Sequence, residues 1–167
     1  MPIQTFNIYT ANGYAGDLVD SGPRVVQTGI LTSASAGFGL VMSRDSATVD
    51  RGVALSDSGA SGAVIDVFAL SQREYNHEAS NRPSDGTDFE YKVAESVSLI
   101  RDGYLYIKLA AGSSAVSGGD KLQFITATGE LTGAAASGTT RLATSNIVAE
   151  EAGIAGDVIK ARIILAD

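Results

Sequence analysis

The stretch Val116–Thr132, which reads VSGGDKLQFITATGELT, decides the fold of this chain. Two glycines and an aspartate mark a turn, and Lys121–Thr126 then has the residue pattern of a strand. Leu122 and Phe124 share one face of this strand at a period of two. Thr128-Gly129 turns the chain again, and the return strand follows. The stretch therefore predicts a β-hairpin with Leu122 and Phe124 facing the core.

Working outward from this hairpin, the neighbouring segments also have the pattern of short strands separated by Gly, Ser and Asp turns. Residues 91–108 predict two strands around the turn Arg101-Asp102-Gly103, because Asp-Gly is a strong hairpin signal. Further strands are predicted over residues 24–30, 39–42, 53–55, 63–70, 146–149 and 158–165. No stretch keeps a period of 3.6 residues over three turns. We therefore expect an all-β fold, a compact β-barrel or sandwich of short antiparallel strands.

Two of these strands place polar side chains on their outer face. In residues 104–109, aliphatic residues alternate with Tyr104, Tyr106 and Lys108. In residues 158–165, Lys160 and Arg162 alternate with aliphatic residues in the same way. The two tyrosines either contribute to a contact surface or pair across strands.

Composition and charge exclude several classes of protein. The chain has 167 residues, 44% of them hydrophobic, a net charge of −7 and no Cys. An acidic chain without a basic run does not suit binding to the nucleic-acid backbone. The absence of Cys excludes disulfides, thiolate metal sites and a Cys nucleophile. The N-terminus lacks the pattern of a signal peptide, and no apolar run approaches the ~20 residues of a membrane helix. We expect synthesis in the cytoplasm without a membrane or nucleic-acid partner.

The domain organisation predicted from these patterns is an N-terminal arm, residues 1–24, followed by one β domain, residues 25–167. Three turn signals interrupt the arm, which either lies irregularly on its own domain or reaches a neighbouring subunit. Within the domain, residues 71–90 form the longest polar segment of the chain. A loop of this length in a compact domain usually has a function or is mobile.

Patterns typical of catalysis are missing from the sequence. His77 is the single His, and no G-x-S-x-G elbow accompanies it. Asp85–Asp88 lacks the alternating carboxylates of a calcium loop, and no glycine-rich segment matches a phosphate cradle. We therefore expect no enzyme activity, no catalytic residue, no metal and no cofactor, and a hydrolase with an unrecognised site is disfavoured.

The order of segments carries more information than any single motif. These segments are GYAGDLVDSGP (13–23), GLV (39–41), RGVAL (51–55), VFALSQREY (67–75), YKVAESVSLIRDGYLYI (91–107), GDKL (119–122), TGEL (128–131) and AGDVI (155–159). Over residues 13–165 this order resembles the structural cement (capsid decoration) proteins of tailed bacteriophages. The chain departs from that family's pattern at Ala94-Glu95, where Gly-Asp is usual, and at Tyr106, where Trp is common.

The resemblance implies a viral structural protein that binds the outer surface of the phage head and bridges major capsid proteins. It implies self-association too, with a homotrimer favoured over a dimer. We assign the contacts with capsid and neighbouring subunits to the arm and the polar loop, through Phe6, Ile8, Tyr9, Tyr14, Arg24, Arg73, Tyr75, His77 and Arg82. The alternative is a β-sandwich that binds glycans or the host surface in a virion fibre or spike. The low aromatic content, 7% with no Trp, disfavours that alternative.

Overall fold

The computed structural model describes residues 15–19, 24–32, 36–44, 51–55, 69–72, 90–91, 93–125, 128–133 and 142–164. These ranges contain strands, bridges and turns, and none of their residues is helical. The strands are β1 (Val25–Leu31), β2 (Ala36–Gly37), β3 (Val41–Arg44), β4 (Gly52–Leu55), β5 (Ala69–Gln72), β6 (Glu90–Tyr91), β7 (Ser96–Lys108), β8 (Lys121–Ile125), β9 (Leu131–Thr132), β10 (Leu142–Ala149) and β11 (Val158–Ile163). The prediction of an all-β fold is confirmed.

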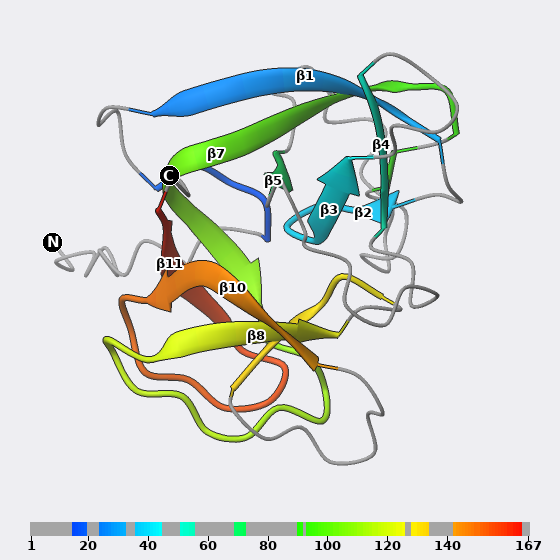
Figure 1. The fold of residues 1–167 in the computed structure, drawn as a ribbon. Helices are drawn as coiled ribbons and strands as arrows, with labels where there is room; N and C mark the ends of the chain where they lie inside the picture. Colours follow the sequence, from blue (N-terminus) through cyan, green and yellow to red (C-terminus); the bar gives the residue numbers. More distant parts are fainter. Residues whose placement is uncertain are drawn as a thin grey trace, which may run out of the picture.

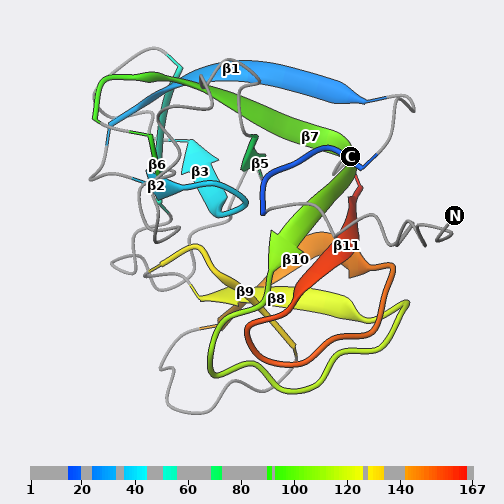
Figure 2. The same ribbon diagram turned by 180° about the vertical axis from the view of Figure 1, so that it is seen from behind.

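The sheet closes on itself twice, and β7 belongs to both rings. Its strand order is β1-β4-β3-β5-β7-β11-β10-β8-β9, and an additional pairing of β1 with β7 closes the first ring. Leu109, just after β7, forms a bridge with Leu131 of β9, which closes the second ring of β7, β11, β10, β8 and β9. Figures 1 and 2 show β7 passing from the half that contains β1 to the half that contains β10 and β11.

The hairpin predicted around Arg101-Asp102-Gly103 is wrong, because β7 is one continuous strand of 13 residues. Asp102 pairs with Val25 of β1, and Gly103 pairs with Ile163 of β11. Asp102 and Gly103, the two residues expected to form the turn, are therefore both paired with residues of other strands. The backbone bends instead at this point, where Gly103 has a φ of 133°.

A β-bulge inside β7 directs its two halves toward different cores. Between Val26 and Val25 of β1 the paired residue on β7 moves from Ile100 to Asp102, so Arg101 is the extra residue. One extra residue reverses which face the following side chains occupy. Consequently the side chains of Val97 and Leu99 pack in the first core, while those of Leu105 and Ile107 pack in the second.

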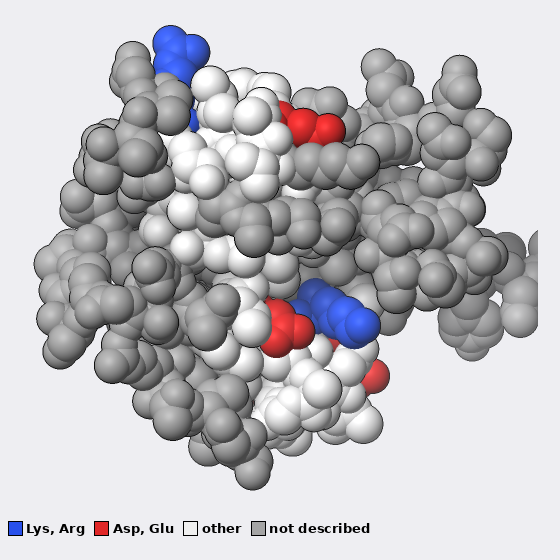
Figure 3. Space-filling view, turned by 90° about the vertical axis from the view of Figure 1, so that its right-hand side faces the viewer, with Lys and Arg blue, Asp and Glu red and all other residues white. Residues whose placement is uncertain are grey.

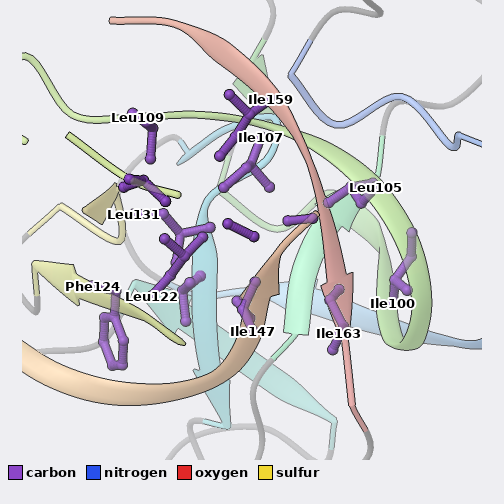
Figure 4. Close-up of a cluster of buried hydrophobic side chains, with 14 residues drawn as sticks. Ile100, Leu105, Ile107, Leu109, Leu122, Phe124, Leu131, Ile147, Ile159 and Ile163 are labelled. Carbon is purple, nitrogen blue, oxygen red and sulfur yellow. The ribbon is translucent and has the colours of Figure 1, made fainter. Parts of the chain in front are cut away.

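The second core is the larger of the two, and its side chains come from strands of both rings. Ile100 joins it from β7, ahead of the bulge, and Val41 joins it from β3 of the first ring. Figure 4 shows side chains of this core along β7, β8, β10 and β11, from Phe124 and Leu122 at one end to Ile163 and Ile100 at the other. Because residues of the first ring contribute to this core, the two rings are packed as one body.

The hairpin predicted in Val116–Thr132 is confirmed. β8 and β9 pair through Gln123 with Thr132 and through Phe124 with Leu131. Leu122 and Phe124 are buried, as their spacing predicted. The backbone amide of Val41 in β3 donates a hydrogen bond of 2.8 Å to the carbonyl of Gly129 in the hairpin turn. The hairpin of the second ring thus contacts the first.

The remaining strand predictions agree with the structure where its residues are described. β1, β3, β4, β10 and β11 each overlap a predicted strand. Of the strand predicted over residues 63–70, only its end lies in β5, and residues 63–68 are outside the described ranges. β1 and β4 pair in parallel, so the sheet is mixed and not wholly antiparallel as expected.

A small second sheet contributes side chains to the first core. β2 pairs with β6 through Ala36 and Tyr91. The Tyr91 ring packs edge-on against Phe38 with a centroid distance of 5.0 Å. Tyr91 and Ala36 also belong to the first core, so this sheet extends that core.

Candidate interaction surface

The outer side of β7 and β11 carries an ordered group of tyrosines and cations. Tyr104 pairs with Arg162, and Tyr106 pairs with Lys160. The alternate residues of both strands, such as Leu105 and Ala161, are fully buried, so these four side chains lie on the outer face. Arg162 is exposed and the other three are half-buried. We call Tyr104, Tyr106, Lys160 and Arg162 the ladder face.

Both cations of the ladder face contact one aromatic ring. Lys160 Nζ lies 4.9 Å from the centroid of the Tyr104 ring, and Arg162 Cζ lies 5.7 Å from it. At exposed sites each such cation–π contact stabilises by about 0.5–1 kcal/mol. The contacts therefore favour conformations of two long side chains that bring two positive charges close to one phenol ring.

The N-terminal segment borders the tyrosine side of this face. Gly16 N donates a hydrogen bond of 2.8 Å to the Tyr106 carbonyl, and Tyr106 N donates one of 2.9 Å to the Asp17 carbonyl. Leu18 forms a bridge with Leu105 and packs against the second core. Residues 16–19 of the predicted arm thus pair with β7 and pack against its core.

Acidic residues border the opposite side of the face. Glu150 N donates a hydrogen bond of 2.9 Å to the Lys160 carbonyl, and Lys160 N donates one of 3.2 Å to a carboxylate oxygen of Glu151. Both glutamates are exposed. The ladder face is therefore a small cationic and aromatic area with an acidic border on one side.

The chemistry of the ladder face suits contact with another protein. Tyr and Arg are the residue types that most often dominate the binding energy of an interface. Within the described ranges, no three His, Asp or Glu side chains gather in a way that could hold a metal ion. In the same part of the chain there is no helix of the length and hydrophobicity that a membrane crossing requires.

The sequence predicted part of this surface. The alternation of Tyr-x-Tyr and Lys-x-Arg with aliphatic residues correctly placed all four side chains on outer faces. It did not predict that these two strands are neighbours, because they are separated by the whole hairpin region. Of the two alternatives that the sequence left open, the structure shows pairing across strands, since Tyr104 lies opposite Arg162 and Tyr106 lies opposite Lys160.

The contact residues predicted in the arm and the polar loop fall almost entirely outside the described ranges. Arg24 is described, and it is exposed immediately before β1. The others are not described: Phe6, Ile8, Tyr9, Tyr14, Arg73, Tyr75, His77 and Arg82.

Charges are dispersed over the face shown in Figure 3. Its described Lys and Arg side chains lie apart, with Asp and Glu side chains close to some of them, and much of the described surface is uncharged. The described part of this face has no continuous basic area of the kind that tracks a nucleic-acid backbone.

Comparison with known proteins supplies the family. Residues 3–164 match the family described as "Structural cement protein (E217 gp24/Pam3 gp6)". No curated protein sequence matches the chain. Among solved structures, a chain of "The capsid of Myoviridae Phage XM1" is similar with a TM-score of 0.68 and 16% identity, and the match covers 95% of this chain and 94% of that one. That likeness concerns the fold, whereas the family match spans almost the whole sequence. The chain belongs to the structural cement proteins of phage capsids.

Proposed function

We propose that this protein binds the outer surface of the phage head and bridges neighbouring major capsid proteins. The observation that carries the proposal is the family match over residues 3–164. A shell that holds packaged DNA gains stability from a protein that joins its subunits, because linked contacts reinforce one another through effective concentration. The role is structural and not enzymatic.

The ladder face is the described surface that best suits the capsid contact. Its tyrosines are half-buried, and both of its cations contact the Tyr104 ring. Little side-chain freedom is therefore lost when a partner covers them, which favours binding. The cations also suit carbonyl and carboxylate groups of a protein partner. The arm and the polar loop remain proposed as further contacts.

The test is co-sedimentation with expanded phage heads that lack the cement protein. The unchanged protein is expected to bind saturably. The double variant Tyr104→Ala/Arg162→Ala should weaken binding by about tenfold or more, which is the usual loss for a dominant interface residue. Lys121→Ala is the matched control, because Lys121 is an exposed cation at the start of β8 and lies two strands from β11. Its affinity should change by less than about twofold.

The outcomes separate the function from the assignment of its surface. If the unchanged protein stays in the supernatant, the proposed function is wrong. If it binds and the ladder-face variant binds equally well, the function stands and the capsid contact lies elsewhere.

The arm is tested by a deletion that ends at residue 14. A longer deletion would remove residues 16–19, which pair with β7 and support Leu18 against the core. We expect the shortened protein to keep its circular-dichroism spectrum and to lose affinity for heads. Unchanged affinity would show that residues 1–14 make no capsid contact.

A further inference from the structure

Three cations lie on the outer side of β7 and β11. Lys160 and Arg162 belong to the ladder face, and Lys108 follows Tyr106 on the same face of β7, because alternate residues of a strand share a face. Lys108 and Arg162 are exposed, and Lys160 is half-buried. The ladder face together with Lys108 is therefore positively charged, and an anionic group is its complementary ligand.

The charges of Lys160 and Arg162 are not neutralised within the described ranges. Neither side chain forms an ion pair there, although the sequence has 19 acidic residues and only 12 basic ones. The carboxylate of Glu151 accepts a hydrogen bond of 3.2 Å from the backbone amide of Lys160, and not from its Nζ. Both cationic groups lie over the Tyr104 ring instead. Two positive charges thus remain available to an anion of another molecule.

The two cationic groups suit a carboxylate. An Arg guanidinium presents a planar fork of N–H donors that matches the two oxygens of a carboxylate, and a Lys ammonium adds a compact positive charge. Because Lys160 and Arg162 gather over one ring, their charges act together on a group placed against that part of the face. A carboxylate side chain provides one negative charge and two acceptor oxygens at such a point.

The acidic border limits how far a negatively charged partner surface extends. Glu150 and Glu151 are exposed beside Lys160, so an extended polyanion such as DNA would meet like charges there. The net charge of −7 acts more weakly at the face itself, because salt screens charges that lie more than about 8 Å away at physiological ionic strength. The local pattern therefore favours an isolated carboxylate on a protein surface.

We propose that Lys160 and Arg162 bind a carboxylate side chain on the outer surface of the major capsid protein. This inference rests on the proposed function and names the chemical group that the ladder face binds. The charge pattern also orients the contact, because complementary charges across an interface fix its register. Capsid groups opposite Glu150 and Glu151 are accordingly neutral or basic.

A zero-length cross-link tests the contact on the unchanged protein. A water-soluble carbodiimide joins a Lys amine to a carboxylate only where the two are in contact, and peptide mass spectrometry identifies both residues. In complexes with phage heads, we expect Lys160 to be joined to an Asp or Glu of the major capsid protein. Lys121 is the matched control, because it is an exposed cation two strands away from β11, and it should give no such cross-link.

Two double variants test the charge of the partner group. Lys160→Gln/Arg162→Gln removes both positive charges, and Lys160→Glu/Arg162→Glu reverses them. The Gln variant should bind heads about tenfold or more weakly than the unchanged protein, and the Glu variant about tenfold more weakly again because it repels the carboxylate. Circular dichroism checks that both variants are folded.

Salt dependence separates a charged contact from a neutral one. The screening length falls from roughly 10 Å at 0.1 M salt to about 3 Å at 1 M. The affinity of the unchanged protein and of Lys121→Gln should fall by about tenfold over this range, whereas that of the Gln double variant should change by less than about threefold.

The outcomes distinguish this inference from the function on which it rests. Failure of the unchanged protein to bind heads would overturn both. Binding to heads without a cross-link from Lys160 to the capsid protein, equal affinities of the folded Gln and Glu variants, or equal salt dependence of the unchanged protein and the Gln variant would overturn the inference alone.

Discussion

Ala94 adopts a backbone conformation that L-residues avoid. Its φ is 68°, in the left-handed region, and it stands where the cement-protein pattern usually has Gly. The turn is held by hydrogen bonds from Ala94 N to the Leu31 carbonyl, 2.8 Å, and from Leu31 N to the Glu95 carbonyl, 3.0 Å. The left-handed conformation costs Ala roughly 1–2 kcal/mol relative to Gly.

We therefore expect Ala94→Gly to stabilise the protein by about 0.5–1 kcal/mol, after the greater freedom of Gly in the unfolded chain is subtracted. In thermal unfolding the midpoint should rise by roughly 1–4 °C. Ala155→Gly is the control, because Ala155 is also exposed in a turn but has no positive φ. Its midpoint should fall. A fall in both variants would mean that Ala94 is not strained.

Thr132 presents a second local conflict. Its side chain is fully buried, and its Oγ1 has no hydrogen-bond partner among the residues that the structure describes. Thr132→Val keeps the shape and removes the hydroxyl, so stability should be unchanged or rise by up to about 1 kcal/mol in chemical denaturation. Thr128→Val is the control, because Thr128 Oγ1 donates an exposed hydrogen bond of 3.0 Å to a carboxylate oxygen of Glu130. Its removal should lower the free energy of unfolding slightly. A larger loss at Thr132 than at Thr128 would contradict this account.

At the scale of elements, the turn between β8 and β9 fixes the position of the second ring against the first. Gly129 has a φ of 72°, and a Cβ at this position would lie 2.6 Å from the Val41 carbonyl oxygen. A backbone atom cannot move aside as a side chain can, so Gly129→Ala should force the hairpin away from β3.

The matched control for Gly129→Ala is Gly119→Ala, because Gly119 has a φ of 93° and open space around its Cβ position. Gly119→Ala should cost about 0.5–1 kcal/mol, which is the cost of its backbone conformation less the gain from the smaller freedom of Ala in the unfolded chain. Gly129→Ala should cost about 1–3 kcal/mol more because of the clash. Urea unfolding of the two variants measures the difference, and equal losses would show that the contact with β3 is unimportant.

Local patterns in the sequence predicted the elements well where their partners are close in the chain. The hairpin Val116–Thr132 has its turn residues and alternating side chains within one short stretch, and β11 has a clear alternation. The pattern failed at Asp102-Gly103, because both residues pair with distant strands, Val25 and Ile163. These pairings outweigh the local preference of Asp-Gly for a turn.

The bulge at Arg101 left no readable signal in the sequence. Val97, Leu99, Leu105 and Ile107 have even spacings, so the alternation predicts that all four share a face. The extra residue makes them face two cores instead. A one-residue irregularity can be recognised only when the register of the neighbouring strand is known.

For the whole molecule, the closure of the sheet depends on contacts between residues far apart in the sequence. β1 pairs with β7, and β7 pairs with β11, so no single segment contains the information that specifies the rings. The ladder face depends on the same long-range pairing. The sequence therefore predicted the class of fold and the family, but not which strands bring Tyr104 beside Lys160 and Arg162.

The thermal stability of phage heads tests the central claim most directly. Heads that lack the cement protein are incubated with this protein or with buffer, and DNA release is followed during heating with a fluorescent dye. We expect the protein to raise the temperature of DNA release until its sites on the head are saturated. An unchanged release temperature at saturating protein would contradict a cementing role.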